Sequence, residues 1–455
     1  MSEKNENIEM ITGDPKKAIV KLSIPMMISM LLIMLYNIAD SIWVAGIGPD
    51  ALAAIGFITP LFVVLVGLGN GIGAGANSLI ARYIGAKDYD QANNAGLHAI
   101  LLCIVISLIF TVVMIIFMRD LLVLMGAGNT IDYALNYGYV VFGALIIFVY
   151  SGVASAIFRS EGDMRRATVA IAVTAVMNII LDPIFIYVLN MGITGAAWAT
   201  VFSATLSCLV MSYWIWGKKD LFLDLSPKNF NFQGRMIVDE LQVAIPSTLE
   251  NVIFSVLAII TNEMLVIVGG TTAVAVYTAS ARIVQLAMIP LIGIGTAELT
   301  VSGVAYGARN YENLKTGHSY SIQLGFILSL ALGSLMFIFS SQIAALFSYT
   351  SASADLAPQI ATAISALSLF VIAIPHGIMS SMLFQGVGKG VYSLIVTLLR
   401  SLILESVCAY IFCFIFGWGL IGIYVGLATG CFLGGIVGYI WAKLFIKRFG
   451  ENLHE

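Results

Sequence analysis

The chain alternates long hydrophobic runs with short polar segments that carry charged residues, glycine or proline. A helix needs about 20 apolar residues to cross the hydrocarbon core of a bilayer, and the runs reach that length. The pattern predicts an all-α integral membrane protein with twelve transmembrane helices. We expect these helices at residues 18–44, 53–78, 95–118, 134–157, 167–189, 194–216, 239–268, 272–297, 317–341, 359–384, 391–415 and 418–446.

Short segments recur in the same order along the chain, about 222 to 227 residues apart. LSIPMM at Leu22 returns as VAIPST at Val243, and FRSEGD at Phe158 returns as FQGVGK at Phe384. Each copy holds six of the predicted helices, so both copies insert with the same topology. The repeat predicts two six-helix lobes related by a pseudo-two-fold axis along the membrane normal.

The polar stretch between the repeats marks the division. We expect an N-lobe at 1–220, a cytoplasmic linker at 221–236 and a C-lobe at 237–455. Arg119 is the one Lys or Arg in the loops on one side of the predicted membrane, so the positive-inside rule places both termini in the cytoplasm. We expect a multi-pass protein of the cell membrane.

Composition narrows the class further. A chain that is 60% hydrophobic and 10% charged is not an ordinary soluble domain. The five cysteines lie in apolar runs without CxxC spacing, which argues against a disulfide framework or a cysteine metal site. The chain has no charged tail that would indicate a nucleic-acid partner. It has no spacing of catalytic residues that would indicate an enzyme or a cofactor. We expect a monomer whose partners are the lipid bilayer and small molecules.

Two aspartates lie inside predicted spans of the first half. Asp40 and Asp182 have no Lys or Arg at membrane depth to pair with, and isolated carboxylates there are costly. Each must therefore be protonated or bind a cation. Asn37 lies three residues before Asp40 and Asn178 four before Asp182, so each asparagine shares a helix face with its aspartate.

Further oxygen groups fall at a similar depth. Thr200 and Tyr137 lie on neighbouring predicted helices, and Pro183 frees a backbone carbonyl beside Asp182. Together they predict an oxygen cluster that carries a proton or holds Na⁺, with Asp40, Asp182, Asn178 and Thr200 as the candidate sodium ligands. Hydrogen bonding between helices remains the alternative for Asn178, Thr200 and Tyr137, and permanent protonation for the aspartates.

The second half carries charges of both signs. Helical turns place Glu250, Arg282, Arg400 and Glu405 near the membrane midplane. They predict either a neutral ion-pair network or a second coupling or substrate site. We expect Glu298, near the end of its helix, to lie at the interface.

Several segments together resemble a known family. GDPKKAIVKLSIPMM from Gly13, LYNIADSIWV from Leu35, FRSEGD from Phe158 and NIILDPIFIY from Asn178 look like signature segments of the multidrug and toxic compound extrusion (MATE) family. The likeness extends from about Gly13 to Lys447 and is greatest to the DinF-like branch, including its archaeal members.

The resemblance implies a secondary antiporter that exports organic cations and amphiphilic compounds by alternating access, in exchange for H⁺ or Na⁺. By residue matches to the family's motifs, its cation-coupling site would comprise Asp40, Asn37, Asn178, Asp182 and Thr200, with Tyr137 as a less firmly aligned member. Other branches carry an essential acid on the seventh helix, where Glu250 lies.

Other functions remain open from the residues. A flippase for lipids or lipid-linked saccharides with the same fold would need a cationic cavity, for which Arg282 and Arg400 are the candidates. The unpaired aspartates argue against it. A channel and an intramembrane enzyme are further alternatives, which single-channel currents and hydrolytic or transferase assays would detect.

Overall fold

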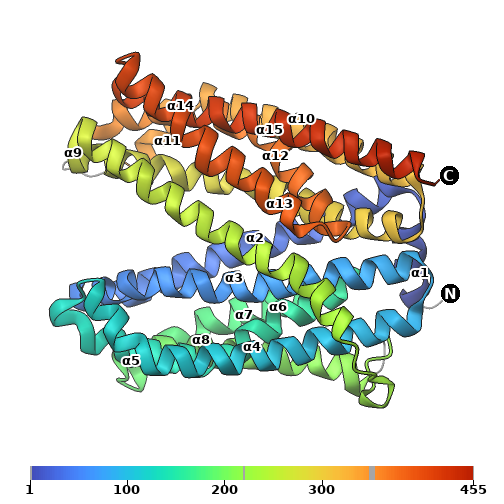
Figure 1. Cartoon of the computed structure of the whole chain (residues 1–455). Helices are drawn as coiled ribbons and strands as arrows, with labels where there is room; N and C mark the ends of the chain where they lie inside the picture. Colours follow the sequence, from blue (N-terminus) through green and yellow to red (C-terminus); the bar gives the residue numbers. More distant parts are fainter. Residues whose placement is uncertain (1–2, 219–220, 348–353, 454–455) are drawn as a thin grey trace. The chain divides into compact units, whose positions relative to one another are not determined.

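The chain is helical almost throughout. The computed structural model describes residues 3–218, 221–347 and 354–453, and these contain helices and loops but no β-strand (Figure 1). Backbone polar groups find no water inside a bilayer, and a helix satisfies them internally. The prediction of an all-α membrane protein is confirmed.

The number of spans agrees with the sequence pattern. Ten helices in the described chain are long and apolar enough to cross a membrane, and one bent helix pair makes an eleventh span. One of the ten, α9 (Gly234–Gly307), has 74 residues and non-helical dihedral angles at Gly270. At 1.5 Å per residue it is about 110 Å long, far more than one crossing of ~30 Å needs. It therefore holds two spans, and the total becomes twelve.

The helices of the first half precede α9 in the chain. They are α1 (Glu3–Thr12), α2 (Pro15–Ala45), α3 (Pro49–Gly85), α4 (Tyr89–Leu124), η1 (Gly128–Thr130), α5 (Ile131–Gly143), α6 (Leu145–Ser160), α7 (Met164–Pro183), η2 (Ile184–Val188), α8 (Gly192–Ser212), η3 (Tyr213–Gly217) and η4 (Pro227–Asn229).

After α9 the chain repeats this order. The elements are α10 (Tyr311–Ile338), α11 (Ser340–Phe347), η5 (Ala354–Leu356), α12 (Ala357–Gly386), α13 (Gly390–Thr397), η6 (Leu398–Glu405), α14 (Ser406–Tyr410), η7 (Ile411–Ile415) and α15 (Gly419–Glu451).

The chain forms two compact units. Unit 1 comprises Met1–Gly13 and Pro25–Thr248, and unit 2 comprises Asp14–Ile24 and Leu249–Glu455. The first turns of α2 therefore belong to unit 2, and the first turns of α9 belong to unit 1. The change of unit falls at or near Pro25 and Pro246, where proline removes a helical hydrogen bond. The predicted lobe and linker boundaries stay a prediction.

The repeat is visible in the backbone. Residues with positive φ occur in pairs at the repeat spacing: Lys87 (60°) with Arg309 (52°), and Gly192 (57°) with Gly419 (59°). Positive φ is strained for an ordinary L-residue, so its recurrence at equivalent turns is a specific likeness. The two halves share turn geometry as well as sequence segments.

Several spans are interrupted. The predicted helix 134–157 bends by 47° where α5 ends and α6 begins, at Ala144. The predicted helices 167–189 and 391–415 end in the π-helical segments η2 and η7. Such wider turns arise where the i to i−4 ladder is disturbed, and they concentrate at functional sites.

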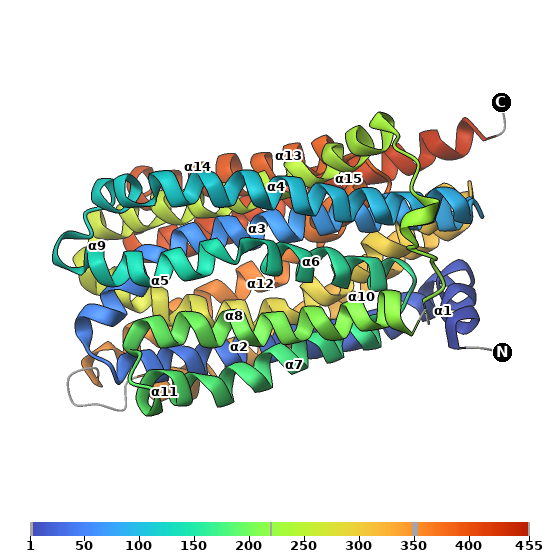
Figure 2. The same ribbon diagram turned by 90° about the horizontal axis from the view of Figure 1, so that it is seen from below.

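Unit 1 places four of these helices around its buried polar groups. Helix α8 packs against α5, α6 and α7, and Figure 2 shows the four side by side. Fully buried Phe142 and Leu145 fill the junction between α5 and α6. Packing of such side chains stabilises the unit through van der Waals contact, since lipid tails are as apolar as the side chains themselves, and it fixes the faces of α5, α7 and α8 that carry the polar residues.

Candidate cation site

The polar centre of unit 1 begins with Asp182 at the end of α7. Its side chain is fully buried, and its Oδ1 accepts a hydrogen bond of 3.2 Å from Nδ2 of Asn178, one turn earlier. The same Nδ2 donates to Oγ1 of Thr200 on α8 at 3.3 Å. The expected i to i+4 pairing on α7 is therefore present, and it extends to a second helix.

Asp40 of α2 meets Asp182 directly. The two carboxyl groups interact side chain to side chain, and Tyr137 of α5 lies in the electrostatic field of both. The Tyr137 hydroxyl also interacts with Thr200. The structure thus brings together Asp40, Asp182, Asn178, Thr200 and Tyr137, as the sequence predicts.

Three oxygens at this centre have no hydrogen-bond partner in the described chain. They are Oδ1 of Asp40, Oδ2 of Asp182 and Oδ1 of Asn178. No lysine or arginine within the described ranges forms an ion pair with either aspartate. Two carboxyl groups in contact cannot both stay charged, so they require a proton or a metal cation between them. Oxygen-only donors suit H⁺ or a hard cation such as Na⁺.

Asn37 stands apart from this centre. Its side chain is exposed and makes no hydrogen bond to a described residue, although its backbone carbonyl accepts one from Ser41. Tyr36, which the sequence analysis missed, interacts electrostatically with Asp40 and Tyr137. Its spacing of four residues before Asp40 is the signal that could have identified it.

Unit 2 holds a different polar cluster around Glu250 of α9. The Ser393 hydroxyl donates to Glu250 Oε1 at 2.5 Å, and Nε2 of Gln385 lies 3.4 and 3.3 Å from Oε1 and Oε2. Gln385 also donates to Ser393 at 3.2 Å. This acid is held by neutral donors, and the sequence analysis identified neither Ser393 nor Gln385.

Arg400 and Glu405 belong to the same unit as Glu250. Both are buried, and Arg400 interacts electrostatically with Glu405 and Glu250 and donates to the Cys431 sulfur at 3.6 Å. The Arg282 side chain is exposed. That Arg282 shares a midplane site with Glu250, Arg400 and Glu405 stays a prediction.

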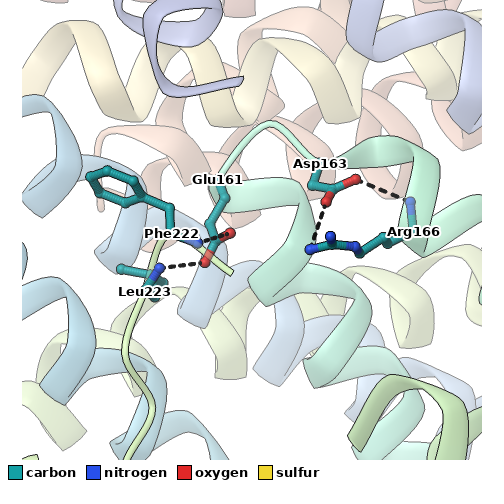
Figure 3. A network of polar contacts seen from close by, with 5 residues as sticks. All are labelled: Glu161, Asp163, Arg166, Phe222 and Leu223. Atoms are coloured by element: carbon teal, nitrogen blue, oxygen red, sulfur yellow. Dashed lines mark hydrogen bonds and ion pairs between the residues drawn. The ribbon is translucent and has the colours of Figure 1, made fainter. Parts of the chain in front are cut away.

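The segment 221–233, which precedes α9, belongs to unit 1. Backbone N–H groups of Phe222 and Leu223 donate to Glu161 at 3.1 and 3.0 Å, while Asp163 caps α7 through Arg166 (Figure 3). Burial raises the pKa of the Glu161 carboxyl to about 8, although the two amide bonds favour its charged form. The predicted linker is therefore anchored over part of its length.

Fold and site define a polytopic membrane protein with two interacting acids in one unit that form no ion pair with a described lysine or arginine. The MatE family profile matches residues 25–184 and 246–411, one match in each repeat. These segments cover well over half of the chain. The chain belongs to the MatE family.

Known relatives agree with this assignment. The chain is 28% identical over 313 residues to "Probable multidrug resistance protein YoeA" of Bacillus subtilis (strain 168), covering 66% of each chain. It is 29% identical over 302 residues to "Multidrug export protein MepA" of Staphylococcus haemolyticus (strain JCSC1435), covering 66% of this chain and 65% of the relative. The matches thus span just under two thirds of these relatives.

A solved structure matches over nearly its whole length. "Crystal structure of MATE in complex with MaL6" has a TM-score of 0.95 and 37% identity, covering 98% of this chain and 99% of the other. The DinF-like and archaeal assignment within the family stays a prediction.

Proposed function

We propose that this protein is a secondary multidrug antiporter that exports organic cations and other amphiphilic compounds in exchange for H⁺ or Na⁺. The observation that carries the proposal is the contact between Asp40 and Asp182, with three partnerless oxygens around it. The names of YoeA and MepA, a resistance protein and an export protein, support the substrate class.

Each residue of the unit 1 site has a separate role in this proposal. Asp40 and Asp182 bind the coupling ion, and Asn178 orients Asp182 through its 3.2 Å hydrogen bond. Thr200 and Tyr137 supply hydroxyl groups at the edge of the site. Ion binding neutralises the aspartates, and that change in charge favours one state of the alternating-access cycle.

The available gradients are large enough for export. One unit of pH difference supplies about 1.4 kcal/mol per proton. A membrane potential of 100 mV adds about 2.3 kcal/mol per charge. Their sum exceeds the ~1.4 kcal/mol that tenfold accumulation of a substrate requires. We place the protein in the cell membrane with both termini in the cytoplasm.

The flippase alternative gains no support from the arginines. Arg282 is exposed, whereas Arg400 is buried and interacts with two acids. A site for an anionic head group would need positive charges that converge, and the buried cluster of unit 2 carries more acid than base.

The test is efflux from proteoliposomes. Purified protein is reconstituted, and ethidium or norfloxacin export is followed under an imposed pH gradient and, separately, a Na⁺ gradient. We expect export with one of the gradients and its loss in Asp40→Asn. Asp132→Asn, an exposed aspartate at the start of α5, is the matched control and should export normally. Normal export by Asp40→Asn would remove this aspartate from the mechanism.

A further inference from the structure

Unit 2 contains a second buried acid–base group, which the export proposal does not use. Glu298 of α9 is 0% exposed and His318 of α10 is 2% exposed, and their side chains meet at 2.6 Å between Nδ1 and Oε1. Glu298 is thus buried inside the protein, and its position near the membrane interface stays a prediction. The two residues come from different helices and form a short charge-assisted contact.

The pair is only partly satisfied. Glu298 Oε2 and His318 Nε2 have no hydrogen-bond partner among described residues, and neither does the buried hydroxyl of Ser302. Ser302 follows Glu298 by one turn, and the Ser321 hydroxyl interacts with the Glu298 carboxyl. Buried polar atoms in native proteins almost always find a partner in protein or ordered water. The three such atoms at this pair and one turn from it point to bound water and to exchange of a proton.

The charged and titratable groups around the pair are few. His376 of α12 interacts electrostatically with His318, and its Nδ1 also lacks a partner in the described chain. The ring of Tyr439 of α15 contacts both histidines, with centroid distances of 6.3 and 5.8 Å. Lys16, in the part of α2 that belongs to unit 2, lies over the Tyr320 ring instead. No arginine or lysine in the described residues forms an ion pair with Glu298.

The repeat shows that the fold itself does not need this pair. Lys87 and Arg309 both have positive φ at equivalent turns, 222 residues apart. The same spacing relates the residues of the two helices that flank each turn. With that spacing, Glu298 corresponds to Ala76 and His318 to Gly96 in unit 1. Neither residue can ionise, and both units still form the same turn. An acid and a base at these positions in unit 2 therefore serve something other than folding.

We infer that Glu298 and His318 together bind one exchangeable proton, which makes a protonation site in unit 2 separate from the aspartates of unit 1. Without the proton the pair is a carboxylate beside a neutral imidazole, with a net charge of −1. Uptake of H⁺ from water gives a neutral pair, either imidazolium with carboxylate or imidazole with carboxylic acid. The partnerless oxygens and nitrogens position the water that delivers it.

A double-mutant cycle of proton counts tests the inference. Proton uptake by the full-length protein in detergent is measured as the pH is lowered from 9 to 5.5, for wild type, Glu298→Gln, His318→Gln and the double variant. If one proton is shared, Glu298→Gln takes up about one proton fewer than wild type, because a buried imidazole without its carboxylate stays neutral, and the double variant loses no more than Glu298→Gln. The inference of a shared site would be overturned if Glu298→Gln took up as many protons as wild type, or if the losses of the two single variants added up in the double variant.

His98 provides a matched control in unit 1. It is fully buried, and both of its ring nitrogens are hydrogen bonded, to Asn94 O at 2.8 Å and from Gln233 N at 3.0 Å. His98→Gln combined with Glu298→Gln should show additive counts, because the two residues belong to different units.

Wild-type protein alone also suffices if the variants do not fold. In the ¹⁵N spectrum of histidine-labelled protein, we expect an imidazole signal from a solvent-protected ring that still changes with pH. If no protected ring responds between pH 5.5 and 9, the inference is wrong. Neither measurement needs a transported compound, so its failure is distinguishable from failure of the export proposal.

Discussion

The two units carry acids at the centre of similar helices but treat them differently. In unit 1, Asp40 and Asp182 face each other and keep oxygens without partners. In unit 2, Glu250 is surrounded by the donors Ser393 and Gln385, and Arg400 lies in electrostatic range. The repeat has thus preserved backbone turns while the buried chemistry has diverged. An acid without a basic partner can exchange a cation, whereas an acid held by donors is already stabilised.

The largest expected effect separates these two centres. Asp182→Asn should lower gradient-driven ethidium efflux at least tenfold, which is about 1.4 kcal/mol of lost coupling, because the cation site loses a charge. Glu250→Gln should lower it less, since the amide can still accept from Ser393. Initial efflux rates from proteoliposomes measure both. Equal losses would show that unit 2 also couples the ion.

A second prediction concerns what the units share. Gly195 and Gly422 occupy equivalent positions, and a Cβ on either would lie 2.6 Å from a backbone oxygen, of Phe185 or Phe412. Gly195→Ala and Gly422→Ala should each destabilise by about 1–3 kcal/mol, with similar losses in thermal stability in detergent. Gly143→Ala, which meets no atom within 4 Å, is the control. Clearly unequal losses would contradict a shared backbone contact.

The third prediction weakens the donor shell of unit 2. Ser393→Ala removes the 2.5 Å hydrogen bond to Glu250 and leaves a buried acceptor short of a partner, a cost of about 1–2 kcal/mol. Ser203 of unit 1 is equally buried but bonds only to Ala199 O of its own helix, so Ser203→Ala should cost less. Thermal unfolding compares the two. A larger loss in Ser203→Ala would mean that Ser393 does not stabilise the acid.

The smallest effect is expected at Glu161. Its pKa is about 8 in the folded protein against an ordinary value of 4.5, so the folded state binds more protons between these pH values. Its contribution to the free energy of unfolding therefore falls as pH rises from about 4.5 to about 8. Glu161→Gln should flatten this pH dependence.

Limited proteolysis of the segment 221–233 across that pH range measures the effect. Asp132→Asn, at an exposed aspartate in the first turn of α5, is the control. A pH profile unchanged by Glu161→Gln would exclude this carboxyl as its source.

Local spacing predicted much of the fold and part of the site. Asn178 and Asp182 lie one helical turn apart, so their hydrogen bond could be expected from the sequence. The contact between Asp40 and Asp182 could be expected from the sequence because neither aspartate had a basic partner at membrane depth. The contact between Glu298 and His318 had no such signal, because these residues are 20 apart on two consecutive helices. Their pairing depends on packing that hydrophobicity does not encode.

The exposure of Arg282 could not be predicted for a related reason. Counting turns gives the depth of a residue along a helix but not the face on which it lies, and a hydrophobic span has no strong polar side to settle the question. The bend at Ala144 and the π-helical segments at the ends of spans, such as η2, η3 and η7, also lack a clear sequence signal, because weak helix formers are tolerated throughout membrane helices.

The exchange of helix beginnings has a consequence for how the chain can be divided. Residues 14–24 are built into unit 2 and residues 234–248 into unit 1. A polypeptide ending at the segment 221–233 would lack residues 234–248, which complete unit 1. It would carry residues 14–24, which belong to unit 2. We therefore expect the halves to be insoluble or degraded when produced alone, and to recover together when coexpressed from separate genes.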